Sequence, residues 1–189
     1  MYRVLLSFGF SQDFISLIKA CLEKIWIAPM INGKLDNFFL DTRGLRQGCA
    51  LSPFLYILMA DSLSRKLTLE KQKGCLPGIR IVKGIDPVNH AIFINDSLLL
   101  GGASPRIAKS FRTILQKYCS ISGALVSERK SVVYGWNTEQ HKIETIANGP
   151  GYTRHADWEK IKYLGLPMML GSNRNHMGEV ITKFKRKIT

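Results

Sequence analysis

Long apolar segments are missing from this chain of 189 residues. No run approaches the roughly 20 consecutive apolar residues that a membrane-spanning helix requires, so no transmembrane helix is expected. The N-terminal stretch is interrupted by Gly9 and lacks the layout of a secretory signal peptide. These two absences predict an intracellular protein, in the nucleus or the cytoplasm, that is not secreted.

Cysteine is scarce and scattered. The four cysteines form no C-x-x-C pair: Cys21, Cys49, Cys75 and Cys119. This spacing argues against a zinc site and against a disulfide framework, and buried thiols in a reducing compartment fit it better. The chain also lacks internal repeats and low-complexity segments.

Negative charge is in short supply as well. The chain has 14 Asp and Glu against 27 Lys and Arg, which gives a net charge of +13. With 46% hydrophobic and 22% charged residues, the composition predicts one globular domain. An excess of positive charge this large attracts polyanions, of which nucleic acid is the first candidate. The alternative is that the cations only solvate the surface, and charge alone supports only non-specific binding.

Segment 90–100 contains two apolar runs on either side of the polar trio Asn95-Asp96-Ser97. The pattern predicts two buried strands joined by a tight turn, because Asn and Asp tolerate left-handed backbone angles and form local hydrogen bonds. Taken alone, this segment fits an ordinary core hairpin better than a functional one.

A second informative segment covers residues 43–53. Gly44 and Gly48 bracket a Leu-Arg-Gln sequence, so the backbone there can approach a ligand closely. Ser52 is predicted to cap a helix with Pro53 at its first position. That helix has apolar residues at four-residue spacing: Leu55, Met59, Leu63 and Leu67. A basic loop before a helix N-terminus suits phosphates and a template strand, although a plain loop before a capped helix is the alternative.

The rest of the sequence predicts elements of a scaffold. A helix capped by Ser11 is expected to end near Lys24, and a hairpin follows with strands at 25–31 and 35–40 around an Asn32-Gly33 turn. The later expected elements are a strand at 79–82, a helix from 105 to 123, a strand at 132–136, and a loop or weak helix over 137–157. The helix at 105–123 has an apolar stripe: Ile107, Phe111, Leu115 and Tyr118. A final helix is expected beyond Asn173, with a basic cluster at its end: Lys183, Lys185, Arg186 and Lys187.

Four segments of the chain resemble motifs of the reverse transcriptases of LINE-type, non-LTR retrotransposons such as those abundant in plant genomes. They occur in the same order as in that family. Segment 43–53 resembles Arg-Gly-Leu-Arg-Gln-Gly-Asp-Pro-Leu-Ser-Pro, with departures at Cys49 and Ala50. The run Phe93-Ile94-Asn95-Asp96 is similar to the family's Phe-Ala-Asp-Asp. Segment 122–131 resembles Ser-Gly leading to Asn-x-x-Lys-Ser, and 162–167 resembles a later strand motif. The resemblance covers about residues 2–174.

The resemblance implies an α+β fold, a reverse-transcriptase palm with partial fingers in which an antiparallel sheet is backed by helices. It implies a partial reverse transcriptase domain over 1–172, lacking the first catalytic strand, and a truncated basic helix over 173–189 toward the missing thumb. The implied partner is an RNA or DNA template-primer.

The resemblance also implies a set of site residues. In the family, two Mg²⁺ ions are held by three aspartates, one on an early strand and two in the hairpin. Asp96 is the surviving catalytic and metal-binding carboxylate, Asn95 is the degenerate position of its partner, and the early aspartate has no counterpart. Lys130 falls on a lysine placed near the incoming triphosphate. Contacts with nucleic acid or nucleotide are expected from five residues: Arg43, Arg46, Gln47, Gly48 and Phe93.

Three hypotheses follow from these departures. Because Mg²⁺ requires anionic oxygens and Asn95 carries no charge, Mg²⁺ binding is expected to be weak or absent, which favours an inactive remnant of an RNA-directed DNA polymerase, translated or only encoded. The second hypothesis is an active enzyme whose missing aspartate comes from another chain. The third is a non-enzymatic nucleic-acid-binding module that uses the basic surface around Arg43, Arg46 and Lys130.

Overall fold

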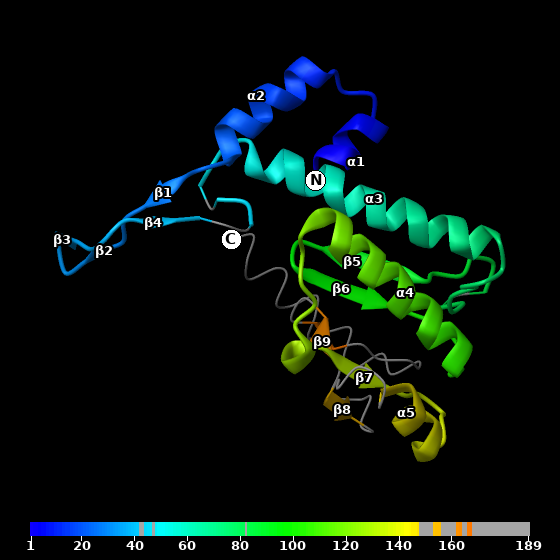
Figure 1. The fold of residues 1–189 in the computed structure, drawn as a ribbon. Helices are drawn as coiled ribbons and strands as arrows, with labels where there is room; N and C mark the ends of the chain where they lie inside the picture. Colours follow the sequence, from blue (N-terminus) through cyan, green and yellow to red (C-terminus); the bar gives the residue numbers. More distant parts are fainter. Residues whose placement is uncertain are drawn as a thin grey trace, which may run out of the picture. The chain divides into compact units, whose positions relative to one another are not determined.

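The computed structural model describes residues 1–41, 44–46, 48–81 and 83–147, together with the backbone of three short strands at 153–155, 162–163 and 166–167. The chain divides into two compact units (Figure 1). The first contains Met1–Gly102 and Arg106–Val126, and the second contains Ala103–Pro105 and Ser127–Thr189. The fold is α+β, with small, mostly antiparallel strand pairs and helices packed beside them.

The first unit begins with two helices, α1 (Tyr2–Ser7) and α2 (Gln12–Leu22). Ser11 is the N-cap of α2, and its hydroxyl oxygen accepts a hydrogen bond of 3.3 Å from the backbone N–H of Phe14. The predicted helix start is therefore confirmed. One buried apolar cluster joins these helices to the helix α3 (Ser52–Gln72): Leu5, Ile15, Ile18 and Leu55.

A two-stranded arm follows α2. It consists of the pairs β1 (Trp26–Ile27) with β4 (Phe39–Leu40) and β2 (Met30–Ile31) with β3 (Lys34–Leu35). The predicted turn is confirmed, because Asn32 and Gly33 both have positive φ, at 50° and 77°. The continuous strands expected at 25–31 and 35–40 are wrong, because each is interrupted between its two short ladders. In β1–β2 the interruption contains Pro29, which has no N–H to donate.

Helix α3 has the predicted apolar stripe, because Leu55, Met59, Leu63 and Leu67 are all buried. Its predicted start needs a correction. Leu51 is the N-cap, and Ser52 lies inside the first turn, where its hydroxyl donates a 2.8 Å hydrogen bond to the carbonyl of Arg46. The hydroxyl therefore closes the preceding loop onto the helix instead of capping the helix N–H groups.

The central hairpin is formed by β5 (His90–Phe93) and β6 (Asp96–Leu99) in antiparallel register. Phe93 pairs with Asp96, so the turn is Ile94-Asn95 and not the polar trio that the sequence suggested. The left-handed φ, 46°, belongs to Ile94 and not to an Asn or Asp. The strands were expected to be buried, but they are only half-buried, and they become exposed toward the turn.

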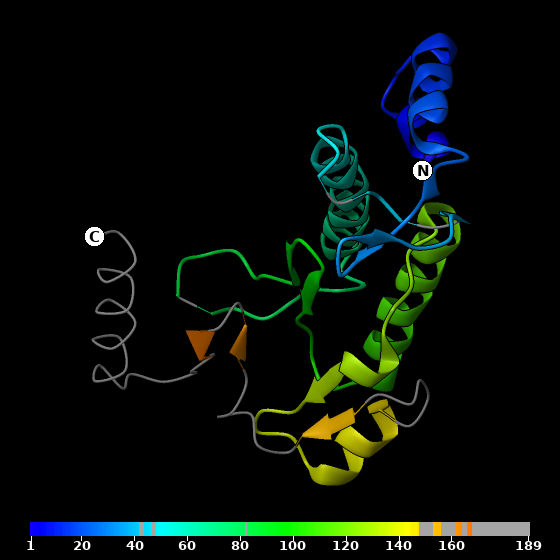
Figure 2. The same ribbon diagram turned by 90° about the vertical axis from the view of Figure 1, so that its left-hand side faces the viewer.

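Helix α4 (Pro105–Ser122) packs with α3 around the hairpin (Figures 1 and 2). A second buried cluster forms here from Leu63 and Leu67 of α3, Leu76, and Ile114 of α4. The predicted stripe is confirmed as core packing, because all of its members lie against this cluster: Ile107, Phe111, Leu115 and Tyr118. Helix α4 ends as predicted before Gly123, which has a φ of 79°. The expected strand at 79–82 is reduced to an isolated bridge between Ile79 and Val88, and Val82 lies outside the described residues.

The second unit contains η1 (Glu128–Lys130), β7 (Val132–Tyr134), α5 (Gln140–Ala147) and β8 (Thr153–His155). Strands β7 and β8 are parallel, with α5 as the connection between them. An antiparallel pair, β9 (Lys162–Tyr163) and β10 (Leu166–Pro167), follows. The helix expected beyond Asn173 and its basic cluster lie outside the described residues. Among the described helices, none is both long enough and apolar enough to cross a bilayer.

Candidate nucleic-acid site

The hairpin turn presents its side chains to solvent. Phe93 is 52% exposed and Ile94 is 58% exposed, and Asn95 and Asp96 are exposed as well. Because directly paired residues of an antiparallel ladder share one face of the sheet, Phe93 and Asp96 lie on the same side of the hairpin. The structure thus brings together the aromatic side chain and the carboxylate that the sequence singled out.

The donor set at this turn does not fit a pair of Mg²⁺ ions. Mg²⁺ prefers several anionic oxygens in a tight octahedron, and a two-metal site needs carboxylates that bridge both ions. Asp96 supplies one carboxylate, and the neighbouring Asn95 supplies a neutral amide. Within the described ranges, no group of three or more His, Cys, Asp or Glu side chains is placed to hold a metal ion. We therefore derive no metal-assisted step at this site.

The basic loop lies directly before α3. Gly44 and Gly48 have φ values of 100° and 82°, a conformation that L side chains rarely adopt, so glycine suits both positions. The close approach of this backbone to a ligand stays a prediction. The carbonyl of Arg46 accepts hydrogen bonds from the Ser52 hydroxyl, at 2.8 Å, and from the N–H of Cys49, at 3.3 Å. Two further predicted residues, Arg43 and Gln47, lie outside the described residues.

The donors at the start of α3 favour negative charge in this loop. A hydrogen bond from the backbone of Leu51 lowers the pKa of the Cys49 thiol, and the hydroxyl of Ser52 lowers it further. The positive charge of Arg46 makes a smaller contribution in the same direction. These donors and the Arg46 guanidinium therefore favour the anionic form of the Cys49 thiol.

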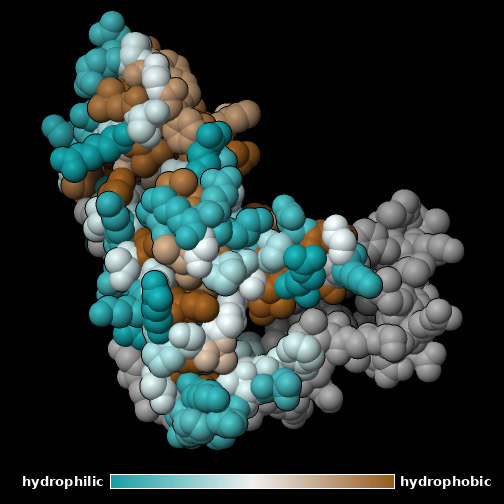
Figure 3. Space-filling model, turned by 90° about the vertical axis from the view of Figure 1, so that its right-hand side faces the viewer, coloured by the Kyte–Doolittle hydropathy of each residue, from teal (hydrophilic) through white to brown (hydrophobic). Residues whose placement is uncertain are grey.

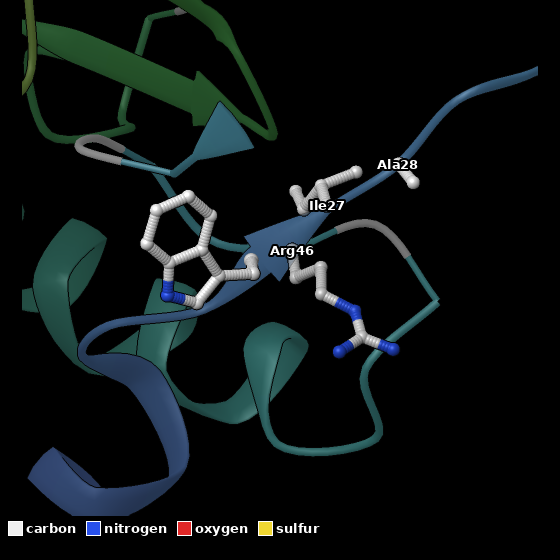
Figure 4. Close-up of a pocket in the computed structure, with 4 residues that line it drawn as sticks. Ile27, Ala28 and Arg46 are labelled. Atoms are coloured by element: carbon white, nitrogen blue, oxygen red, sulfur yellow. The ribbon is translucent and has the colours of Figure 1, made fainter. Parts of the chain in front are cut away.

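A cavity of about 480 Å³ opens beside this loop. Its lining comes from β1, the residue after β1, and the loop (Figure 4): Trp26, Ile27, Ala28 and Arg46. Arg46 was predicted from the sequence, and Trp26 was not. The local pattern gave no signal for it, because an aromatic residue at the start of a strand is typical of core packing.

Lys130 ends η1 in the second unit, where its side chain is exposed. The hairpin with Asp96 belongs to the first unit. The placement of Lys130 near a bound triphosphate stays a prediction from the sequence.

A polar network under the hairpin was also missed. Buried Asn89 donates from Nδ2 to the carbonyls of Leu67 and Leu76, at 2.8 and 3.2 Å. His90 bridges Asn89 and Ser64, with its ring nitrogens 2.7 and 2.8 Å from their side-chain oxygens. The network fixes β5 against α3, and so it positions the hairpin turn. No local motif indicates this network, because Asn89 and His90 bond to residues that are distant in the sequence.

The sequence of this chain is similar to those of known proteins. The family described as "Reverse transcriptase (RNA-dependent DNA polymerase)" matches residues 1–168 of the chain. An uncharacterized mitochondrial protein of Arabidopsis thaliana is 40% identical over 68 residues, which are 36% of this chain. The chain spans about half the length of that relative, since the match covers 56% of it.

Proposed function

Because this chain belongs to the reverse transcriptase family, we propose that it binds a nucleic-acid template-primer without extending it. The observation that carries the proposal is the hairpin turn. There Asp96 pairs with Phe93 across the ladder, and its neighbour in the sequence is the neutral Asn95. Members of the family depend in general on divalent metal ions. One carboxylate beside an amide lacks the negative charge that attracts two such ions.

Nucleic-acid binding is supported by charge and by the loop before α3. The net charge of +13 produces a field that attracts polyanions over the whole surface. Arg46 is exposed, and Ser52 and Cys49 donate hydrogen bonds to its carbonyl, so a solvent-accessible cation is attached close to the N-terminus of α3. We further propose that the chain derives from the LINE-type, non-LTR branch of the family, with RNA or DNA as template.

Primer extension tests the catalytic part of the proposal. The full chain is incubated with a primed RNA template, nucleotides and either Mg²⁺ or Mn²⁺. We expect no template-dependent incorporation, because the turn cannot hold the two ions that the reaction needs. Incorporation that disappears in Asp96→Ala would contradict the proposal and would favour an active enzyme completed by another chain.

A charge-restoring variant tests the reason for inactivity. Asn95→Asp places a second carboxylate next to Asp96, so we expect it to bind Mn²⁺ more tightly than the unchanged protein. Paramagnetic broadening of the hairpin resonances measures the binding. The matched control is Asn32→Asp, which adds the same charge at another exposed hairpin turn, between Ile31 and Gly33, where neither neighbour is acidic. Equal Mn²⁺ affinity of the two variants would show that the turn is not a remnant of a metal site.

Filter binding against salt tests the nucleic-acid part. We expect the logarithm of the affinity to fall linearly with the logarithm of the salt concentration, with a slope that reports the number of phosphates contacted. Arg46→Ala should weaken binding and lower this slope by about one, because it removes one phosphate contact. Arg80→Ala, at another exposed arginine, is the control. Binding that is absent or independent of salt would overturn the proposal.

A further inference from the structure

We infer that Trp26 and Arg46 form a subsite for one nucleotide of a single-stranded nucleic acid, with its base stacked on the indole and its phosphate paired with the guanidinium. The inference rests on the proposed function and deepens it, because it names the part of the nucleic acid that this chain recognises. It adds to the basic loop an aromatic residue from a different element, β1.

Trp26 is held in place but left open. Trp26 is the first residue of β1 and pairs with Leu40 of β4. Next to this pair, the N–H of Asp41 donates a 2.8 Å hydrogen bond to the carbonyl of Ile25. Its side chain is nevertheless 63% exposed, and Trp26 belongs to neither buried cluster of the first unit. A large aromatic surface on a fixed backbone is a preorganised platform, because stacking on it requires little further ordering.

Arg46 approaches the same cavity from the loop. Two hydrogen bonds to its carbonyl attach its backbone to the start of α3, while its side chain remains exposed. Trp26 and Arg46 both line this cavity, and the Arg46 guanidinium extends away from β1 (Figure 4). A ligand in this cavity can contact both an aromatic face and a cation.

A nucleotide has the chemistry that this cavity recognises. The cavity has a volume of about 480 Å³ and is open to solvent, so it has room for a base without enclosing it. Ile27 and Ala28 contribute apolar surface, and none of the four described lining residues is acidic. Every base has a π-face that stacks on an aromatic ring, and guanidinium matches phosphate geometry. A base inside a duplex already stacks on its neighbours, so the subsite favours a single strand.

The test uses the full chain and strands that differ only in their bases. The probes are oligo-dT, oligo-U and an abasic strand of equal length, which keeps the phosphates and lacks the bases. Trp136→Phe and Trp158→Phe leave Trp26 as the single tryptophan, so its fluorescence reports stacking directly. We expect oligo-dT and oligo-U to quench this fluorescence and to bind about tenfold more tightly than the abasic strand.

Two variants separate the base contact from the phosphate contact. Trp26→Leu should lose the preference for strands with bases, and Trp26→Phe should keep most of it. Arg46→Ala should weaken all three probes by the same factor, because each carries the same phosphates. Phe38→Leu is the matched control, an exposed aromatic residue of the same arm that does not line the cavity, and it should change nothing.

An unchanged preference for bases in Trp26→Leu, in a protein that still binds both kinds of strand, would overturn the inference and leave the proposed function intact. Failure of the unchanged protein to bind any strand would overturn both. Equal affinity of the unchanged protein for oligo-dT and for the abasic strand would overturn the inference without any variant, so the test does not depend on how well the variants fold.

Discussion

The hydroxyl oxygen of Ser64, on α3, lies 2.8 Å from Nε2 of His90, on β5. The other ring nitrogen, Nδ1, lies 2.7 Å from Oδ1 of Asn89, whose amide nitrogen already donates to two backbone carbonyls. Since Oδ1 can only accept, Nδ1 carries the proton, and Nε2 accepts from Ser64. Both ring nitrogens are therefore paired in the neutral form of His90, and the network ties the central hairpin to α3.

The first prediction concerns pH. Burial lowers the pKa of His90, and the positive charge of Lys71 lowers it further, so the unfolded chain binds this proton more tightly than the folded protein. The free energy of unfolding is therefore highest above the unfolded-state pKa of about 6.5, where His90 is neutral in both states, and it falls as the pH drops below that value. Urea unfolding between neutral pH and moderately acidic pH measures the effect. His90→Gln should flatten this dependence, and an unchanged slope would show that His90 is not its source.

The second prediction concerns Asn89, which is only 2% exposed. Asn89→Ala removes the amide that satisfies the carbonyls of Leu67 and Leu76 and should lower the free energy of unfolding by about 3 kcal/mol. Asn37→Ala, at an exposed position, is the control and should stay within about 0.5 kcal/mol of the unchanged protein. Chemical denaturation measures both values. A loss at Asn89 no larger than at Asn37 would contradict this account of the hairpin.

The third prediction concerns the hairpin turn. Ile94 has a φ of 46°, which costs a β-branched residue about 1–2 kcal/mol, and its side chain is largely exposed. Ile94→Gly removes this strain but increases the freedom of the unfolded chain, so a net gain of about 0.5–1 kcal/mol is expected. Asn95→Gly should not stabilise, because Asn95 is not in the left-handed region. Thermal unfolding measures the change in stability, and a destabilised Ile94→Gly protein would contradict this prediction.

The fourth prediction concerns the arm, which Figure 2 views end-on, pointing toward the reader. Several large apolar side chains of the arm are exposed: Trp26, Met30, Ile31, Leu35, Phe38, Phe39 and Leu40. Apolar side chains also reach the surface near the first helices, at the top of Figure 3, but there they are interspersed with polar ones. Many exposed apolar side chains on short, open strands favour self-association of the purified chain.

The pair Met30 and Leu35, which face each other across the arm, tests this prediction. Replacing them together, Met30→Lys with Leu35→Glu, introduces an opposite-charge pair and leaves the net charge unchanged. We expect the variant to sediment as a smaller species than the unchanged protein. Leu69→Lys, at a scattered exposed leucine of α3, should have little effect. Equal self-association of all three proteins would exclude the arm as the contact surface.

Features that depend on short-range interactions were predictable from the sequence, and features that depend on long-range interactions were not. The Ser11 cap, the buried stripe of α3, the Asn32-Gly33 turn and the end of α4 at Gly123 were predicted correctly, because each depends on residues within a few positions of one another. The role of Ser52 and the register of the central turn were wrong. Both depend on where a neighbouring segment lies, and a shift of one residue changes the turn completely.

The sequence by itself determined that this chain is basic, that it belongs among the reverse transcriptases, and that an amide, Asn95, stands next to the carboxylate of Asp96. Only the tertiary structure decided what surrounds these residues. It placed Trp26 beside Arg46 and joined Ser64 to His90 across 26 positions of the chain. Such pairs form when packed helices and strands bring distant segments together, and no local periodicity encodes which distant side chain will be the neighbour.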